Sequence, residues 1–306
     1  MDKIDKDILR DLFRFNCRAS YRSLARKFGL SPNAVKNRVT KMIDQGVIRK
    51  FQVSLNHEMT GMELVFGLVF TDGTENSVEF VSKVGGNPII SNVLTLTALE
   101  GGAYFIDGHC SGPNKLAELG TMLRGFDQVR QVELHMAFRP WKGRKVEFSK
   151  AQLKVIRCLQ QDARMRIEEI AQRTGMASKT VRRILREIEP GNGLYYHCRV
   201  DYSAGGVVDA TLRIEWDGKT TSLEEMFDWI RLEYKDDLWI VYMSSTEPVM
   251  YACFMLDSIL DFGLISNRIR EQPFVKSTTP LIAIAADSFE SPGEAMLREM
   301  LDKAGV

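Results

Sequence analysis

The stretch LARKFGLSPNAVKNRVTKMIDQGVI, Leu24–Ile48, decides the fold of this 306-residue chain. Gly29 stands where a helix C-cap is expected, and Ser31 and Pro32 are a favoured N-cap and a favoured first helical residue. The apolar residues that follow recur at helical spacing and predict one buried stripe: Val35, Val39, Met42 and Ile43. A short helix, a Gly-containing turn and a second helix with a polar outer face form the helix-turn-helix pattern.

The neighbouring sequence completes this unit. An earlier helix is predicted by four apolar residues at helical spacing: Ile4, Ile8, Leu9 and Leu12. Tyr21–Phe28 gives the short second helix, and Gly46 ends the third. The β-favouring stretch IRKFQVSL, which begins at Ile48, predicts a strand or wing packed beside the third helix.

The unit occurs twice, about 146 residues apart. Ile8–Val39 aligns with Val155–Leu185 when one residue near Phe15 is treated as an insertion. The coinciding positions are Leu9/Ile156, Leu12/Leu159, Arg18/Arg164, Leu24/Ile170, Ala25/Ala171, Gly29/Gly175 and Val35/Val181. In the second copy LYYHCRVD, which begins at Leu194, takes the place of the strand. The repeat predicts two copies of the same structural unit.

A pattern of different period follows each copy. After the first it predicts strand, helix, strand, strand, helix and strand over Leu64–Phe70, Ser77–Lys83, Ile89–Thr97, Ala103–Cys110, Asn114–Leu123 and Val129–Ala137. After the second, the same order covers Val208–Trp216, Ser222–Tyr234, Leu238–Ser244, Val249–Leu256, Ser258–Glu271 and Val275–Ala286. This βαββαβ order predicts a ferredoxin-like domain, with helices on one face of an antiparallel sheet. The predicted fold class is therefore α+β, with two tandem copies of a winged helix-turn-helix domain followed by a ferredoxin-like domain.

The elements predict five segments along the chain. They are a winged helix-turn-helix domain at 1–56, a βαββαβ domain at 62–139, a second winged helix-turn-helix domain at 149–201, a second βαββαβ domain at 206–287 and a C-terminal helix at 288–306. The last helix should begin near Ser291 and Pro292. The stretch RPWKGRKVEF, Arg139–Phe148, is the predicted linker between the halves.

The composition is that of a folded intracellular protein. Apolar residues make up 44% and charged residues 26%, and no low-complexity tract indicates disorder. The N-terminal MDKIDKDILRDL lacks the apolar core of a signal peptide, and no apolar run has the length to span a bilayer, so we expect a cytoplasmic protein. The scattered cysteines indicate neither a metal site nor a disulfide and should be mostly buried thiols: Cys17, Cys110, Cys158, Cys198 and Cys253.

The net charge of +1 conceals an asymmetry. Residues 1–56 carry 13 Lys and Arg against 5 Asp and Glu, and residues 142–201 carry 14 against 7. The remaining residues are acidic, with a net charge of −14. Two basic segments on an otherwise acidic chain predict two surfaces for a polyanion such as duplex DNA.

Leu24–Ile48, and VIRCLQQDAR at Val155–Arg164, resemble the N-terminal domain of the Lrp/AsnC (feast-or-famine) family of regulators almost position by position. The resemblance is strongest over residues 4–56, good over 150–189 and limited to the order of elements in the βαββαβ segments. It implies a helix-turn-helix dimer that binds DNA, and α/β domains that pair through their sheets and often hold an amino acid. It also implies that the fused chain mimics one family dimer, and that the protein is a homo-oligomer, a dimer or higher.

The apolar stripe of the third helix defines which residues face outward. In the first copy these are Asn33, Lys36, Asn37, Thr40 and Lys41, preceded by Ser31 at the N-cap. An Asn side chain can form two hydrogen bonds with one adenine, and a Lys side chain can approach guanine or phosphate. Both contacts suit a helix in the major groove. The flanking cations are expected to contact phosphates: Arg22, Arg26, Lys27, Arg49 and Lys50. The opposing interpretation is a solvated helical face.

The second copy carries a more charged set of outward residues: Lys179, Arg182, Arg183 and Arg186. The two copies should therefore read different half-sites or differ in their reliance on phosphate contacts. Ala177 and Ser178 replace Ser31 and Pro32, and Pro190–Gly193 interrupts the approach to the following strand. Two interpretations stay open for this copy: a second DNA reader, or a scaffold.

The stretch LEGGA, Leu99–Ala103, joins the central strands of the first βαββαβ segment. The resembled family commonly has a Gly-containing turn near its ligand at this place. Bare backbone at Gly101 and Gly102 suits a small carboxylate or amine, which predicts a small-molecule effector such as an amino acid. The family usually has an Asp shortly after that Gly, whereas Ala103 follows here. Gly-Gly is itself a hairpin signal, so a plain turn is the alternative.

No catalytic residues, cofactor or metal site are predicted. The four histidines are too scattered for a triad: His57, His109, His135 and His197. We therefore expect a sequence-specific DNA-binding transcription regulator of Lrp/AsnC type, not an enzyme. One alternative is a tetrapyrrole enzyme, because sirohaem decarboxylases resemble the same two-domain fold and Ile48–Phe51 with Asn56 and His57 is faintly similar to their Arg-rich wing. The other is an interaction partner that does not bind DNA.

Overall fold

The computed structural model describes residues 1–98, 100–139 and 143–306, and it divides into two compact units. Unit 1 contains residues 1–61, the described residues from 143 to 201, and 290–306, whereas unit 2 contains 62–139 and 202–289. Leu99 of the predicted effector turn, and Pro140, Trp141 and Lys142 of the predicted linker, lie outside the described residues. The boundaries of the five segments stay a prediction.

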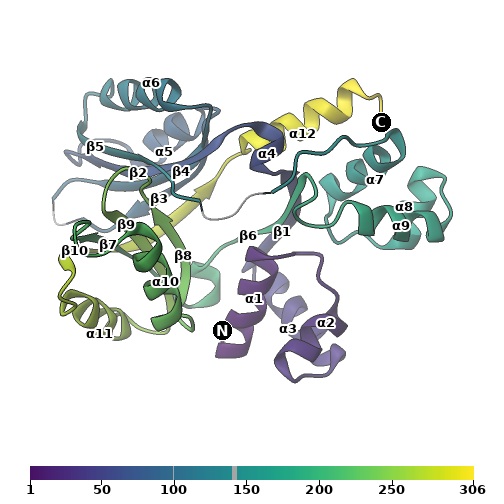
Figure 1. Cartoon of the computed structure of the whole chain (residues 1–306), viewed down its shortest axis with the longest axis horizontal. Helices are drawn as coiled ribbons and strands as arrows, with labels where there is room; N and C mark the ends of the chain where they lie inside the picture. Colours follow the sequence, from purple (N-terminus) through teal and green to yellow (C-terminus); the bar gives the residue numbers. More distant parts are fainter. Residues whose placement is uncertain (99, 140–142) are drawn as a thin grey trace. The chain divides into compact units, whose positions relative to one another are not determined.

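Unit 1 contains two three-helix motifs and a two-stranded ribbon (Figure 1). The first motif consists of α1 (Lys3–Arg14), α2 (Tyr21–Phe28) and α3 (Pro32–Asp44), followed by β1 (Ile48–Leu55) and the helical turn α4 (His57–Thr60). The second consists of α7 (Lys150–Gln161), α8 (Ile167–Thr174) and α9 (Ser178–Glu187), followed by β6 (Leu194–Val200). The C-terminal helix α12 (Pro292–Lys303) packs against β1, α4 and α7.

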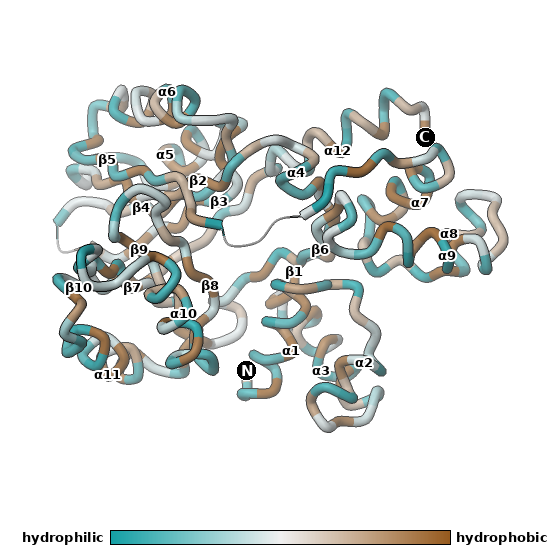
Figure 2. The backbone as a smooth tube through the Cα atoms, in the orientation of Figure 1, coloured by the Kyte–Doolittle hydropathy of each residue, from teal (hydrophilic) through white to brown (hydrophobic). Residues whose placement is uncertain are grey.

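Apolar faces hold each motif together. Figure 2 shows hydrophobic and hydrophilic stretches alternating along these helices, as expected when one face is buried. The buried residues of the first motif include Ile8, Leu9, Leu12, Leu24, Val35, Val39 and Met42. Ile43 was predicted to share this stripe, and that prediction is wrong, because its side chain is 41% exposed. Ile43 follows Met42 by one residue, about 100° around the helix, and therefore lies at the edge of the face that Val35, Val39 and Met42 bury.

The strand after α3 pairs with the equivalent strand of the second motif. β1 and β6 run antiparallel, from Ile48 opposite Val200 to Leu55 opposite Leu194. Each motif therefore supplies one strand to a shared ribbon. A lone strand would leave its backbone N–H and C=O groups unpaired on both edges, and the second copy supplies a partner of the same geometry for one of them.

The two motifs are related by a pseudo-two-fold axis. Arg18 donates to the carbonyl oxygens of Ala163 and Met165, at 2.6 and 2.9 Å. Its repeat equivalent, Arg164, donates to the carbonyl oxygens of Cys17 and Ala19, at 2.6 and 3.0 Å. The acceptors are themselves equivalent positions of the repeat. Such reciprocal contacts are the mark of an isologous interface, here formed inside one chain.

Unit 2 contains the two βαββαβ modules. The first consists of β2 (Glu63–Thr71), α5 (Ser77–Gly85), β3 (Ile90–Leu96), β4 (Ala103–Cys110), α6 (Pro113–Arg124) and β5 (Val129–Met136). After the short 3-10 helix η1 (Ser203–Gly205), the second consists of β7 (Val208–Trp216), α10 (Leu223–Glu233), β8 (Leu238–Met243), β9 (Val249–Leu256), α11 (Ile259–Arg270) and β10 (Val275–Ser288). The predicted α+β class, with ferredoxin-type modules, is confirmed.

The modules share one antiparallel sheet, in the order β5-β2-β4-β3-β10-β7-β9-β8. β3 pairs with β10, and Ala137 beyond β5 bridges to Ser244 beyond β8, so the sheet curves until its outer edges meet. Figure 1 shows α5 and α6 on one side of the strands and α10 and α11 on the other. The inner faces of the two modules pack through apolar side chains that include Phe66, Leu68, Phe105, Tyr251 and Leu281. Joining the modules covers edge strands that would otherwise be exposed.

An ion pair crosses between the inner faces. The Arg213 Nε atom of β7 lies 2.9 Å from Glu133 Oε1 of β5, and the Tyr251 hydroxyl donates to the same oxygen at 2.6 Å. Burial alone would raise the pKa of Glu133, but hydrogen bonds with His135, Tyr251 and Arg213 outweigh it and lower the pKa to about 2. The carboxylate therefore stays charged and links the two modules. Of the helices in the described part of the chain, none has the length and hydrophobicity to span a membrane.

Candidate nucleic-acid interface

The third helix of the first motif is held in place at both ends. Ser31 caps α3 by accepting a hydrogen bond from the Ala34 N–H, and Pro32 occupies the first turn. Ser20 caps α2 in the same way, and Gly29 ends it with a left-handed φ of 66°, a conformation that costs other residues energy. The turn between α2 and α3 therefore has a defined shape, and the outer face of α3 is presented on a rigid support.

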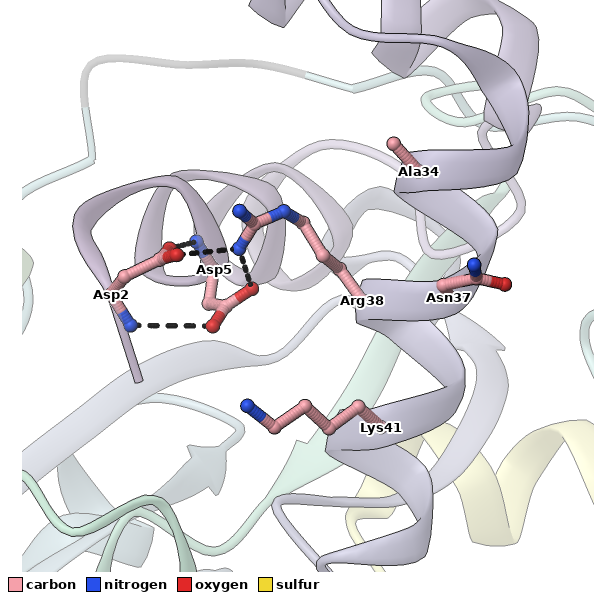
Figure 3. A pocket seen from close by; sticks show the side chains of 6 residues that line it. All are labelled: Asp2, Asp5, Ala34, Asn37, Arg38 and Lys41. Carbon is pink, nitrogen blue, oxygen red and sulfur yellow. Dashed lines mark hydrogen bonds and ion pairs between the residues drawn. The ribbon is translucent and has the colours of Figure 1, made fainter.

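The predicted reading residues of the first copy all reach solvent. Asn33, Lys36, Asn37, Thr40 and Lys41 are exposed, whereas Val35, Val39 and Met42 between them are buried. Figure 3 shows Asn37 on the side of α3 opposite to Arg38. Together with the exposed Ser31, these side chains form a polar face, which we name the α3 face. A helix of this kind fits the major groove, where amide and ammonium groups meet base edges.

Arg38 has a structural role that the sequence did not reveal. Its guanidinium donates to Asp2 at 2.7 Å and to Asp5 at 2.6 Å, which ties α3 to the start of α1 (Figure 3). These carboxylates neutralise Arg38, and a hollow of about 380 Å³ beside them is also lined by Ala34, Asn37 and Lys41. The contact fixes the tilt of α3 on α1. The sequence feature that corresponds to this contact is the pair of acidic residues Asp2 and Asp5 near the N-terminus, because α3 is rich in basic residues.

The cations around the α3 face divide into paired and unpaired groups. Arg22, Arg26, Lys36, Lys41 and Lys50 are exposed and form no ion pair with any described residue. Lys27 pairs with Asp11 at 2.5 Å, and Arg49 pairs with Asp201. The unpaired cations present positive charge directly to solvent, as expected for contacts to phosphate.

The second copy places its cations against its own acids. Lys179, Arg182, Arg183 and Arg186 are all exposed on α9, as predicted from the repeat. Arg182 lies 3.7 Å from Glu168, and Arg183 pairs with Glu187. Glu168 and Glu169 on α8 occupy the positions of Arg22 and Ser23 on α2. Acids at positions where the first copy is predicted to contact phosphate make this face less positive than the α3 face.

The caps of the second motif are also weaker. Arg166 and Ala177 stand at the N-caps of α8 and α9, and neither makes a side-chain capping hydrogen bond. Both positions hold Ser in the first motif. A missing cap leaves backbone N–H groups of the first turn to water and lowers helix stability. The two copies therefore share a shape and differ in both charge and rigidity.

The predicted effector turn packs against its own module. The Gly102 N–H donates to Thr71 Oγ1 at 3.0 Å, and the Thr71 N–H donates to the Gly102 carbonyl at 2.9 Å. A Cβ added at Gly101 would lie 2.1 Å from the Thr71 carbonyl oxygen, so close backbone approach accounts for this glycine. Effector binding at these residues stays a prediction.

A family model described as winged helix-turn-helix DNA-binding matches residues 1–49 and 148–189. Both three-helix motifs of unit 1 are thus similar to this family over these residues. Among curated proteins, it is 38% identical over 65 residues to the HTH-type transcriptional regulator Ptr1 of Methanocaldococcus jannaschii, across 21% of this chain and 43% of that protein. An uncharacterized HTH-type transcriptional regulator of Pyrococcus furiosus is 36% identical over 84 residues, across 28% of this chain and 53% of its own length. The chain thus spans about half of these relatives or less.

Two solved structures of the siroheme decarboxylase NirDL match the entire chain. One has a TM-score of 0.55 at 12% identity, and the other, a complex with an iron-uroporphyrin III analogue, has 0.57 at 14%. In each case the match covers 100% of both chains. At this identity the likeness shows a shared fold. The expectation from the sequence that the chain is not an enzyme is therefore wrong as an exclusion, because an enzyme, NirDL, shares this fold over the whole chain.

Proposed function

We propose that this chain is a DNA-binding transcription regulator of Lrp/AsnC type, in which one polypeptide supplies both helix-turn-helix motifs of a family dimer. The α3 face carries the proposal: exposed Asn and Lys side chains lie on a capped helix and are surrounded by cations without acidic partners among the described residues. The transcriptional regulators that match part of the chain by sequence support it. A cytoplasmic location is part of this proposal.

The proposed site is asymmetric. The first motif contributes Ser31, Asn33, Lys36, Asn37 and Lys41 as reading residues, with phosphate contacts from Arg22, Arg49 and Lys50. The second contributes Lys179, Arg182, Arg183 and Arg186. The second motif has Lys and Arg but no Asn at these positions, so we assign it mainly to the phosphate backbone, with contacts that the acidic neighbours of Arg182 and Arg183 weaken. Two unlike motifs across a pseudo-two-fold axis should select a bipartite site with one well-defined half.

The test is selection of bound duplexes from a random pool, followed by affinity measurements in a salt series. Replacing Lys36 and Asn37 by alanine should erase the sequence preference of one half-site, because each good base contact contributes about 1–3 kcal/mol of discrimination. Replacing Arg182 and Arg183, their repeat equivalents, should weaken all duplexes alike and flatten the log-log salt dependence by roughly one unit per lost phosphate contact.

A matched control is Lys115→Ala on α6, an exposed cation of unit 2 that pairs with Glu118. It should leave both affinity and salt dependence unchanged. If Lys36→Ala with Asn37→Ala retains the selected motif, α3 does not read bases and the proposal fails.

We propose an amine-bearing effector, such as an amino acid, for the turn at Gly101 and Gly102. Glu75 lies beside it and accepts hydrogen bonds from Thr71 and Tyr104 on one oxygen, both at 2.7 Å. Its other oxygen, Oε2, is buried and has no hydrogen-bond partner among the described residues. Calorimetric titration with a set of amino acids tests this, and no heat of binding from any of them would remove the effector from the proposal.

The whole-chain likeness to NirDL favours a second candidate, binding and decarboxylation of a tetrapyrrole. In the inter-module cluster, Arg213 and His135 are the groups that would receive a carboxylate of the ligand, which would have to take the place of Glu133. Titration with an iron uroporphyrin, followed by its visible absorption, tests this candidate. A spectrum unchanged by the protein eliminates it, whereas a saturable shift together with absent duplex selection would replace the regulator proposal.

A further inference from the structure

Helix α11 exposes an apolar stripe that its own module does not cover. Ile259, Leu260 and Leu264 are 62%, 73% and 51% exposed, and Gly263 between them has no neighbouring atom within 4 Å of where a Cβ would stand. Figure 2 shows hydrophobic stretches along this helix. The opposite face of α11 is buried through Phe262, Ile265 and Ile269. Contiguous exposed aliphatic side chains on a folded surface mark an interaction site.

The repeat supplies an internal comparison for this surface. Helix α6 holds the same place in the first module, and its residues at the positions of Ile259, Leu260, Gly263 and Leu264 are Pro113, Asn114, Ala117 and Glu118. These α6 residues are exposed as well. The fold therefore accommodates polar residues at these positions, and the aliphatic stripe of α11 is not a requirement of the module.

Charge and spacing indicate what covers the stripe. Leu260, Leu264 and Arg268 follow one another at intervals of four and lie on one line along α11, whereas Asp257 stands just before the N-cap residue Ser258, at the start of the helix. Asp257 and Arg268 are exposed at its two ends, one acidic and one basic. If a second copy of α11 is turned by 180°, Asp257 of one copy lies opposite Arg268 of the other, and Leu260 lies opposite Leu264.

We propose that two copies of this chain associate through α11, packed antiparallel about a two-fold axis near Gly263. Leu260 of one copy then contacts Leu264 of the other, and Asp257 faces Arg268. The absence of a side chain at Gly263 lets the two helices approach closely at the crossing point. The interface is isologous, so it closes at two copies and does not extend into a filament. It is independent of DNA and of any ligand.

Light-scattering mass measured over a dilution series tests the association. We expect the wild-type chain to reach twice its 34.8 kDa mass. The change Leu260→Asn with Leu264→Glu introduces the residues of α6 and should return the mass to one chain. Gly263→Glu provides a second variant that cannot fail through packing, because the space at this position is open. Asn114→Ser with Glu118→Gln on α6 is the matched control and should keep the dimer.

Cross-linking tests the geometry. Gly263→Cys should form an inter-chain disulfide on mild oxidation, because the two-fold axis brings the two thiols together, and the five native cysteines are buried. Ala117→Cys, the same position on α6, should stay monomeric on a denaturing gel. A wild-type mass of one chain at every concentration, a dimer that survives Gly263→Glu, or equal cross-linking of both cysteine variants would each overturn the proposal.

Discussion

At the scale of the residue, the ionisation of the Asp209 carboxyl opposes folding. Asp209 lies on β7 beside Met255 of β9, and burial raises its pKa to about 7. In the unfolded chain the carboxyl ionises near pH 4. A raised folded pKa contributes stability that is present below the unfolded pKa and is lost as pH rises toward the folded one. The native fold therefore loses stability through Asp209 between about pH 4 and pH 7.

We expect Asp209→Asn to raise the free energy of unfolding by about 2 kcal/mol at pH 8 and to have little effect at pH 4, since the amide is neutral throughout. Urea unfolding at a series of pH values measures this. Asp228→Asn, at an exposed position of α10, is the control and should change stability at neither pH. An equal effect of Asp209→Asn at both pH values would show that shape, and not ionisation, is responsible.

At the scale of the element, the third helices of the two repeat copies differ in their N-caps. The N-cap of α3 is Ser31 with a side-chain hydrogen bond, and the N-cap of α9 is Ala177 without one, although both residues have extended backbone dihedrals. An N-cap hydroxyl contributes about 0.5–2 kcal/mol to helix stability. The sequence alone therefore predicts which helix-turn-helix motif is the more firmly ordered.

Ala177→Ser should stabilise the second motif by about 0.5–1 kcal/mol, and Ser31→Ala should destabilise the first by a similar amount. Hydrogen exchange of the amides in the first turn of each helix gives the measurement. Ala117→Ser, at an exposed position inside α6, tests the specificity of the effect, because a serine away from a cap gives no such gain. Faster exchange in α9 after Ala177→Ser would contradict the prediction.

At the scale of the whole molecule, the two helix-turn-helix motifs act as one body because Arg18 and Arg164 bridge them. Arg164 also lies over the rings of Tyr21 and Phe51, at 4.6 and 5.3 Å from the ring centres. Removing either guanidinium leaves carbonyl oxygens of the other motif without donors. Within unit 1, the contacts of Arg18 and Arg164 fix the relative orientation of α3 and α9, the two helices that we propose contact DNA.

We expect Arg18→Leu and Arg164→Leu each to lower the unfolding free energy by about 2–4 kcal/mol, through lost charged hydrogen bonds. Each should also weaken binding to a bipartite duplex more than binding to an isolated half-site. Arg22→Leu is the contrasting variant, because its side chain is exposed. It should weaken binding to both duplexes equally and leave the unfolding free energy unchanged. Equal losses of affinity for both duplexes in Arg164→Leu would show that the contacts of Arg18 and Arg164 have no specific role in DNA binding.

The sequence predicted local structure well where that structure depends on residues close together in the chain. The span of Tyr21–Phe28 as a helix, and those of Ala103–Cys110 and Val249–Leu256 as strands, agree with the structure to the residue, because caps, glycines and periodicity act within a few positions. The outward set of α3 also followed from periodicity, except that Ile43 was placed on the buried side. The ion pairs of Arg38 with Asp2 and of Arg182 with Glu168 did not follow, since they join residues on different helices.

What the sequence by itself determined is the repeated order of helices and strands, the face that each helix buries and the residues that it leaves outside. These depend on the intrinsic geometry of helix and strand and on the division between apolar and polar residues. The tertiary structure alone decided that β1 pairs with β6, that β3 joins β10 in one sheet, and that Arg18 and Arg164 exchange hydrogen bonds. Each of these joins the two halves of the chain. Unpaired strand edges and carbonyl oxygens have no local partner, and no pattern within one half specifies which distant group will satisfy them.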